Sequence, residues 1–200
     1  MKVKHLVGAF LCVLGCYACS SPKTEVQSPD GHIKMTLTVD ENGKPFYNVS
    51  VDDSLLIENS AMGFTAANGI ILAEGFQVKN TTFSSEDETW TQPWGENKKN
   101  RNHYNEMAVS LTNEDQVQLT LRFRVFDDGI GFRYEYTVPT VDSLLITDEL
   151  TTFHFHRDGT SWSIPASAET YELLYQQQPI SEVETANTPF TFKTADGVYG

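Results

Sequence analysis

The stretch Val117–Phe126, VQLTLRFRVF, decides the fold class. Apolar and polar residues alternate along its whole length. A period of two is typical of a β-strand that buries one face and exposes the other. The apolar positions are Val117, Leu119, Leu121, Phe123 and Val125, and the polar positions are Gln118, Thr120, Arg122 and Arg124. The stretch therefore predicts a strand in a sheet with one buried face and one polar face.

The same period recurs on both sides of this stretch. His32–Val39 alternates as cleanly, and turn-forming residues follow at 40–44, 112–115 and 127–129. Residues 60–75 are less regular and indicate a strand and a loop. No segment shows a helical period, so the pattern predicts an all-β fold, an antiparallel β-sandwich. The other expected strands are Phe46–Val51, Leu55–Ile57, Phe76–Phe83, Met107–Leu111, Ile130–Val138, Leu144–Ile146 and Phe153–Phe155.

The first 21 residues, Met1–Ser21, form a secretory leader. Lys2 and Lys4 precede a short apolar run that is too short to span a bilayer. Cys16 and Cys19 each follow a small residue and are candidate lipid-attachment sites of a bacterial lipoprotein. Ordinary cleavage after Ala18 is the alternative. Either route predicts an exported protein, in the periplasm or attached to the outer membrane as a lipoprotein.

All the cysteines of the chain, Cys12, Cys16 and Cys19, lie in this leader. The remaining residues, 22–200, must therefore hold together without disulfides and need a real hydrophobic core. Their number suits one domain.

The formal net charge of −13 excludes one class of partner. Nucleic-acid binding requires a basic footprint, so we expect no nucleic-acid partner. Simple electrostatic docking on anionic lipid is disfavoured for the same reason. An acidic surface is compatible with a neutral sugar or a divalent cation and requires neither.

The stretch Glu88–Glu106, ETWTQPWGENKKNRNHYNE, is the densest group of candidate binding residues. Aromatic rings can stack on the apolar face of a sugar, and planar amide and guanidinium groups suit paired hydroxyls. We expect a loop that lines a sugar subsite or an interface with another domain. The alternative is a long hairpin connection in which the tryptophans form a local core. The candidate substrate-binding residues are Trp90, Trp94, Arg101, Asn102 and His103, with Tyr104 and Glu106 beside them.

This stretch also resembles the N-terminal region of glycoside hydrolase family 97. Four further pieces follow the family pattern in the same order, and together they cover essentially all of the chain after the leader. They are SPDG (28–31), FRVFDDGIGFRYEY (123–136), WSIPASAETYELLY (162–175) and ANTPF (186–190).

The resemblance implies a large N-terminal β-sandwich that packs against a catalytic (β/α)8 barrel. It implies exported, calcium-dependent α-glucosidases or α-galactosidases of Bacteroides-like bacteria, with α-linked oligosaccharides as substrates and the catalytic carboxylates in the barrel. Glu172 matches a glutamate that resembles a calcium ligand at the edge of the active site, although Ala166–Ala168 departs from the family pattern just before it. Because calcium takes six to eight oxygen ligands, we expect calcium binding only together with a barrel.

Two weaker metal candidates have simpler explanations. His154 and His156 are two residues apart in an expected strand and would share a face, which can serve a metal but also suits a polar face. Asp127-Asp128-Gly129 resembles part of a calcium loop, but the remaining oxygen ligands do not follow, so a tight turn is expected. The sequence contains no phosphate-binding glycine loop, Gly-x-Ser-x-Gly elbow or HExxH motif.

The leading hypothesis is an N-terminal, barrel-bracing and carbohydrate-binding domain of a family 97 glycosidase. Because the barrel lies beyond residue 200, we expect the chain to be truncated near the end of the sandwich, to have no catalytic residue and to be inert alone. The first alternative is a stand-alone periplasmic or surface carbohydrate-binding lipoprotein. The second is a structural fragment that has lost its partner.

Overall fold

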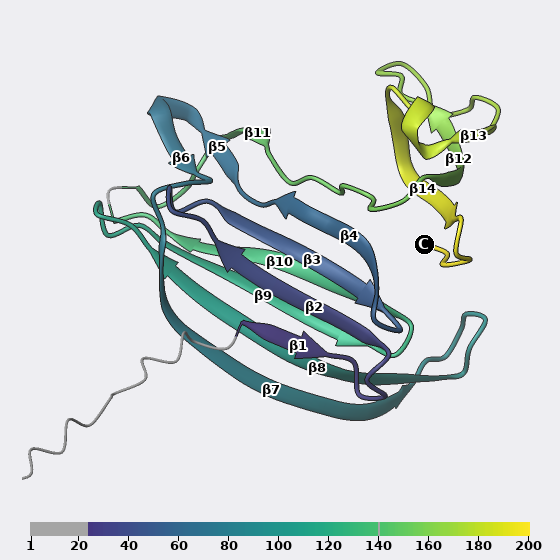
Figure 1. Cartoon of the computed structure of the whole chain (residues 1–200), viewed down its shortest axis with the longest axis horizontal. Coiled ribbons are helices and arrows are strands. Elements are labelled where there is room, and N and C mark those ends of the chain that lie inside the picture. The colour runs from purple at the N-terminus through teal and green to yellow at the C-terminus, as the bar shows by residue number, and fades with distance from the viewer. Residues whose placement is uncertain (1–23, 140) are drawn as a thin grey trace, which may run out of the picture.

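The computed structural model describes residues 24–139 and 141–200. Two four-stranded antiparallel sheets stack face to face (Figure 1). The first has the order β1-β2-β3-β4 and the second the order β10-β9-β8-β7, so each is a meander of neighbours in sequence. The first sheet is built from β1 (Glu25–Gln27), β2 (Ile33–Val39), β3 (Pro45–Val51) and β4 (Ser54–Ala61), and the second from β7 (Gln77–Thr91), β8 (Lys99–Thr112), β9 (Gln118–Phe126) and β10 (Gly129–Thr137). The predicted antiparallel β-sandwich is confirmed.

The core lies between these two sheets, and the predicted period of two builds it. On β9, Leu119, Leu121, Phe123 and Val125 are at most 1% exposed, whereas Arg122 and Arg124 lie on the outer face. β2 and β8 contribute the same way. The core also includes Met35, Leu37, Tyr47, Val49, Ile57, Met62, Phe64, Leu72, Phe76, Met107, Val109 and Leu111.

Two smaller sheets flank the sandwich. One has the order β11-β5-β6, from β5 (Phe64–Ala66), β6 (Ile70–Leu72) and β11 (Ile146–Glu149). The other has the order β13-β12-β14, from β12 (Gly159–Pro165), β13 (Gln176–Pro179) and β14 (Ala186–Thr194), and forms a separate C-terminal lobe of residues 157–200 (Figure 1). Short 3-10 turns occupy Ala67–Gly69 and Ile180–Glu182.

The prediction of a loop at residues 88–106 is wrong. β7 and β8 pair continuously from Gln77 opposite Thr112 to Thr91 opposite Lys99, which leaves only residues 92–98 as the connection. The polar side chains of this stretch find partners on the opposite strand, so they do not need a loop.

Residues 150–156 close the edge of β4, although they contain no named strand. Backbone N–H groups of Leu150, Thr152 and His156 donate to carbonyls of Gly63, Ala61 and Leu56 at 2.9–3.0 Å, and Glu58 donates to His154 at 2.8 Å. The strand predicted at Phe153–Phe155 is thus reduced to one bridge, between Phe155 and Ile57. Irregular backbone here still satisfies the edge of the first sheet.

The remaining expectations differ in detail. The strand expected at Leu144–Ile146 begins at Ile146, and residues 60–75 contain β5 and β6 around a 3-10 turn. Within the described ranges, no helix has the length and hydropathy needed to cross a membrane.

Candidate functional site

The candidate sugar-contacting residues lie on a two-stranded arm. β9 begins to pair with β8 only at Tyr104, so residues 87–103 of the β7–β8 hairpin, which we call the arm, have no third strand beside them. Figure 1 shows the arm extending beyond the end of the sandwich, toward the same end as the C-terminal lobe. The arm therefore presents both of its faces to its surroundings.

Strand pairing separates the predicted cluster onto two faces. Directly opposed residues share a face in an antiparallel pair. Asn102, which is opposite Glu88, lies on the face of Trp90, Tyr104 and Glu106. Arg101 and His103 point to the other face, in line with the core residue Met107. The predicted residues are thus neighbours in sequence but do not form a single constellation.

Cross-strand contacts hold the polar side chains of the arm in place. Arg101 donates to both carboxylate oxygens of Asp87, at 2.7 and 2.8 Å. These hydrogen bonds from Arg101 hold the pKa of Asp87 below its usual value. Asn102 Nδ2 donates to Glu88 Oε1 at 3.1 Å. The arm is a pre-ordered ribbon with fixed polar groups.

The tip of the arm exposes its tryptophans. Trp94 is 83% exposed and Trp90 is 48% exposed, so the alternative of a local aromatic core is not what the structure shows. Gln92 fixes the turn, because its Nε2 donates to the carbonyl of Asn97 at 2.9 Å. Gly95 has φ +113, and a Cβ there would lie 2.6 Å from that Nε2. Trp94, Gln92 and Lys98 line a hollow of about 510 Å³, together with Thr91, Pro93 and Gly95.

A partly exposed ion network, built around the buried Glu106, lies beside the arm on the outer face of the second sheet. Glu106 is only 8% exposed and accepts from Arg122 at 2.5 Å and from Arg124 at 2.8 Å. Arg122 also donates to Glu135 at 2.8 and 3.0 Å. The Arg124 guanidinium lies 4.4 Å from the centre of the Tyr104 ring.

The electrostatics of this network favour the charged forms. Hydrogen bonds from Arg122 lower the pKa of Glu135 to about 2. Burial raises the pKa of Glu106, but hydrogen bonds from Arg124 and Arg122 outweigh it and leave that pKa below its usual value. Sequence reasoning missed the network. The available signal was the pair of arginines at alternate polar positions of the stretch 117–126.

Glu172, the predicted calcium ligand, lies in the C-terminal lobe as an exposed side chain. Its backbone N–H donates to Thr170 Oγ1 at 3.0 Å. The described residues include no group of three or more His, Cys, Asp or Glu side chains that could hold a metal ion. At this position the described part of the chain thus offers one carboxylate, whereas calcium takes six to eight oxygen ligands.

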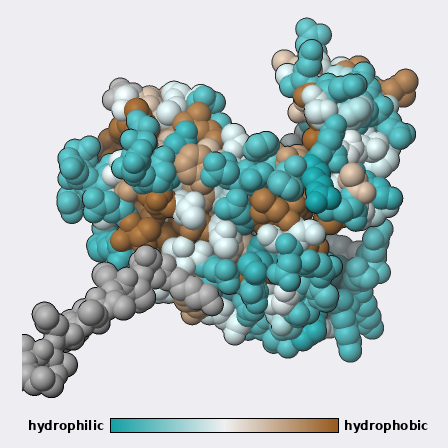
Figure 2. All heavy atoms as spheres, in the orientation of Figure 1, coloured by the Kyte–Doolittle hydropathy of each residue, from teal (hydrophilic) through white to brown (hydrophobic). Residues whose placement is uncertain are grey.

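Exposed apolar side chains flank Glu172 in the sequence. Tyr171 is 75% exposed, Leu174 is 89% exposed and Tyr175 is 59% exposed. Figure 2 shows hydrophobic residues at the outer surface of the lobe as well as on the sandwich. A contiguous run of exposed large apolar residues is unusual on a soluble surface and marks an interaction site.

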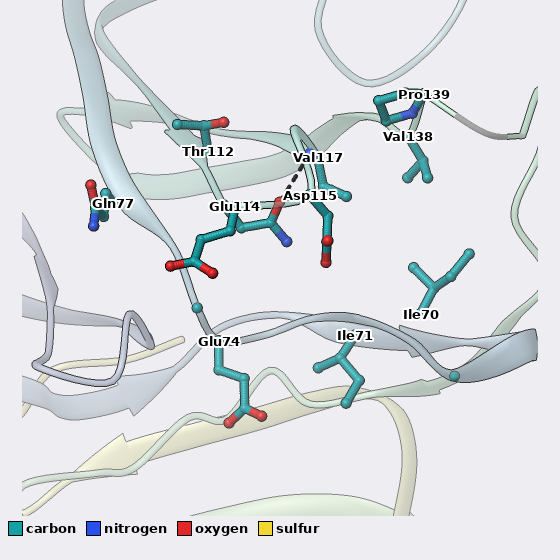
Figure 3. Close-up of a pocket in the computed structure, with 13 residues that line it drawn as sticks. Ile70, Ile71, Glu74, Gln77, Thr112, Glu114, Asp115, Val117, Val138 and Pro139 are labelled. Carbon is teal, nitrogen blue, oxygen red and sulfur yellow. Dashed lines mark hydrogen bonds between the residues drawn. The ribbon is translucent and has the colours of Figure 1, made fainter.

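A cleft of the sandwich lies away from the arm. It has a volume of about 840 Å³ and opens where Thr112 ends β8, whereas the arm is at the other end of that strand. Three carboxylates, of Glu74, Glu114 and Asp115, are arranged around it (Figure 3). It contains none of the candidate residues and no aromatic ring. Neither the arm nor Glu172 uses it.

The weaker candidates have structural partners. His156 Nδ1 lies 2.7 Å from Glu58 Oε2 and ties residues 150–156 to β4. Asp127 accepts from the backbone N–H of Asp30 at 2.9 Å and lies 3.6 Å from His103 Nδ1. The expected turn at Asp127–Gly129 is confirmed. The candidate lipidation sites Cys16 and Cys19 lie outside the described residues.

Known proteins match this chain with the same fold. An enzyme of glycoside hydrolase family 97 from Pseudoalteromonas sp. strain K8 has been solved in complex with panose and in complex with acarbose. In both comparisons the TM-score is 0.79 and the identity 36%, over 88% of this chain and 27% of that one. A retaining alpha-galactosidase of Bacteroides thetaiotaomicron is 28% identical over 133 residues, which are 66% of this chain and 19% of that protein.

The chain thus spans about a quarter or less of the length of these relatives. The family model described as glycosyl-hydrolase 97 N-terminal matches residues 26–200, which is nearly the whole described part. The sandwich, its meander topology and these matches agree. The chain belongs to the glycosyl-hydrolase 97 N-terminal family.

Proposed function

We propose that this chain serves as the N-terminal domain of an exported, calcium-dependent α-glycosidase that acts on oligosaccharides. In this proposal the sandwich braces a catalytic (β/α)8 barrel, the arm forms part of the wall of the substrate pocket, and Glu172 supplies one calcium ligand. The 200 residues contain no catalytic acid or base of their own. The leader carries the chain out of the cytoplasm, with Cys19 or Cys16 as lipid anchor.

The exposed tip of the arm is the observation that supports a sugar-contacting role. Trp94 is 83% exposed on a ribbon whose polar side chains are already fixed by Asp87 and Glu88. An exposed aromatic ring on a ribbon with ordered hydrogen-bonding groups suits a sugar, because the ring can cover the apolar face of the sugar. The relatives point to the same ligand class, since one is named an alpha-galactosidase and another was solved with panose.

The lobe supports the bracing role. The exposed apolar residues around Glu172 would be covered by a second domain, which would also place that carboxylate beside ligands from elsewhere. Glu172 alone cannot satisfy a calcium ion that takes six to eight oxygens. Glu172 therefore fits the role of one calcium ligand in a site that a second domain completes.

A chimera tests the whole proposal. Residues 24–200 would replace the matching segment of the Pseudoalteromonas enzyme, which would supply the barrel. We expect an active chimera in which Glu172→Gln raises the calcium concentration needed for half-maximal activity at least about tenfold. Glu169→Gln, three residues away, is the matched control. Equal calcium responses of the two variants would refute the ligand role of Glu172.

The claim that the chain alone is inert has its own assay. Purified chain should not hydrolyse nitrophenyl α-glucosides or α-galactosides with or without calcium. Turnover that depends on Glu172 would contradict it.

A stand-alone carbohydrate-binding protein is the second candidate, and the exposure of Trp94 favours it too. Saturable binding of maltose-series or galactose-series sugars by the isolated chain, lost in Trp94→Ala, would support this role. Absence of binding alone, with an active chimera, would leave the domain role.

A further inference from the structure

The edge strands on the two sides of the sandwich differ in whether other backbone covers them. On the β4 side, residues 150–156 lie along the edge of the first sheet and satisfy its backbone groups. The opposite side has β1 as the edge of the first sheet and β7 as the edge of the second. Figure 1 shows these two edges together along one border of the sandwich. This second side is the open side.

The edge of β7 is long. The strand has 15 residues, and among the described residues its only neighbouring strand is β8. At about 3.4 Å per residue, it offers roughly 50 Å of backbone that can pair with another strand. Proteins usually shorten, cover or charge such edges, because an unpaired edge is a template for another chain.

An apolar side chain of the inner layer is exposed on this side. Phe83 lies opposite the fully buried Met107 and so points toward the core layer, yet it is 52% exposed. It lines a cleft of about 680 Å³ with Ser84, Ser85, β1 and the loop 28–31. The open side therefore combines unpaired backbone with an uncovered phenyl ring.

The charges along β7 are asymmetric. Residues 80–85, NTTFSS, carry no charge, Lys79 precedes them, and Glu86, Asp87 and Glu88 follow. A parallel partner strand of the same sequence would oppose acid to acid. An antiparallel partner of the same sequence would place each Lys79 beside the acidic end of the other strand.

We propose that the β7 edge binds a second copy of this chain, in antiparallel pairing centred on Phe83. A two-fold axis requires directly opposed residues to lie on the same face, so one residue must face its own copy. With Phe83 in that position, Asn80 lies opposite Glu86 of the second copy. Lys79, at the register shift between Val78 and Asn80, lies next to this pair and so near the acidic run 86–88 of the second copy. The two phenyl rings meet at the open side and cover each other.

The neighbouring register is less favourable. Centring on Thr82 would oppose Phe83 to Thr81, so that the aromatic pair is lost. The sequence thus favours one register, which makes the pairing testable by crosslinking.

Cysteine substitution reads this register directly. The chain has no cysteine after Cys19. We expect Phe83→Cys to form a disulfide between two copies under mild oxidation, because opposed Cβ atoms in an antiparallel pair are about 4.5–5.5 Å apart. Thr82→Cys should crosslink at least about tenfold more slowly. Faster crosslinking of Thr82→Cys would overturn the proposed register.

Sedimentation equilibrium of the purified chain tests the association itself. We expect a monomer–dimer equilibrium that weakens with added salt, since the flanking charges are exposed. Lys79→Glu, at an exposed position, should raise the dissociation constant at least about threefold, and Phe83→Glu should leave only monomer. Circular dichroism would establish that Phe83→Glu is folded.

Leu145→Glu is the matched control, since Leu145 is 72% exposed and lies outside β7. It should leave the equilibrium unchanged. A chain that stays monomeric up to about millimolar concentration, or a dimer lost in Leu145→Glu but kept in Lys79→Glu and Phe83→Glu, would refute the proposal.

Discussion

Asp30 and Asp127 are 97 residues apart in the chain, and the backbone N–H of Asp30 donates to Asp127 Oδ1 at 2.9 Å. This bond joins the loop before β2, in the first sheet, to the β9–β10 turn of the second sheet. Asp30 itself accepts from Ser28 Oγ at 2.6 Å and from the backbone of His32 at 3.0 Å. The hydrogen bond from Ser28 holds the pKa of Asp30 below its usual value. Two short motifs, SPDG and DDG, thus form one tie between the sheets.

We predict that Asp127→Ala lowers the free energy of unfolding by about 0.5–1.5 kcal/mol, the net value of one intramolecular hydrogen bond. Asp127→Asn keeps the acceptor oxygen and should recover most of the loss. Urea denaturation of the two variants measures the difference. Equal losses would show that the charge, and not the bond to Asp30, is what matters.

The ion network of Glu106, Arg122 and Glu135 predicts a loss of stability in acid. Both glutamates have a folded-state pKa below the unfolded value, and that of Glu135 is about 2. A depressed pKa contributes stability that is present above the unfolded pKa, near 4.5, and is lost as the pH falls through the folded pKa. The melting temperature should therefore fall between about pH 4.5 and pH 2. In Arg122→Met this pH dependence should be weaker than in the parent chain, and an unchanged profile would contradict the assignment.

Gly43 is expected to tolerate no side chain. Its φ is +74, and a Cβ would lie 2.2 Å from the backbone N of Phe76, which donates to the Gly43 carbonyl at 3.0 Å. We predict that Gly43→Ala costs at least about 2 kcal/mol of unfolding free energy, since it combines backbone strain with a clash. Gly131→Ala is the control, because a Cβ there meets nothing within 4 Å. Thermal unfolding of both variants provides the comparison.

Trp94 should contribute almost nothing to stability. Truncating a buried tryptophan typically costs about 3–5 kcal/mol, whereas a surface substitution changes stability by about 0.5 kcal/mol or less. At 83% exposure, Trp94 belongs to the second class. Trp94→Ala should therefore have the same melting temperature as the parent chain. A loss of several kcal/mol in the free energy of unfolding would mean that the ring packs against the protein.

Sequence patterning predicted the layers of the fold well, because burial on one face forces alternation. Leu119, Leu121 and Phe123 were identified as core residues from this period alone. The arm was wrongly expected to be a loop, because Arg101 and Asn102 are satisfied by residues 14 positions earlier and local patterning cannot show such pairs. The same limit hid the network around Glu106.

The candidate site was predicted only in part. The residue types of the arm were recognised, but their division between two faces depends on register, which a polar strand does not reveal. The prediction that Glu172 is a calcium ligand depends on the resemblance to the family, because an exposed carboxylate has no signature in the local sequence. Residues 150–156 close the β4 edge through irregular backbone, which periodicity does not detect.

The meander order of both sheets also bears on how the chain can form structure while it is being synthesised. In β1–β4 and again in β7–β10, each strand pairs with the one before it, so each hairpin can form as soon as its second strand has emerged. The outer edge of β4 in the first sheet, however, stays unpaired until residues 150–156 are made. During synthesis this edge would stay available to chaperones or to neighbouring chains for nearly a hundred residues, counted from the end of β4 at Ala61.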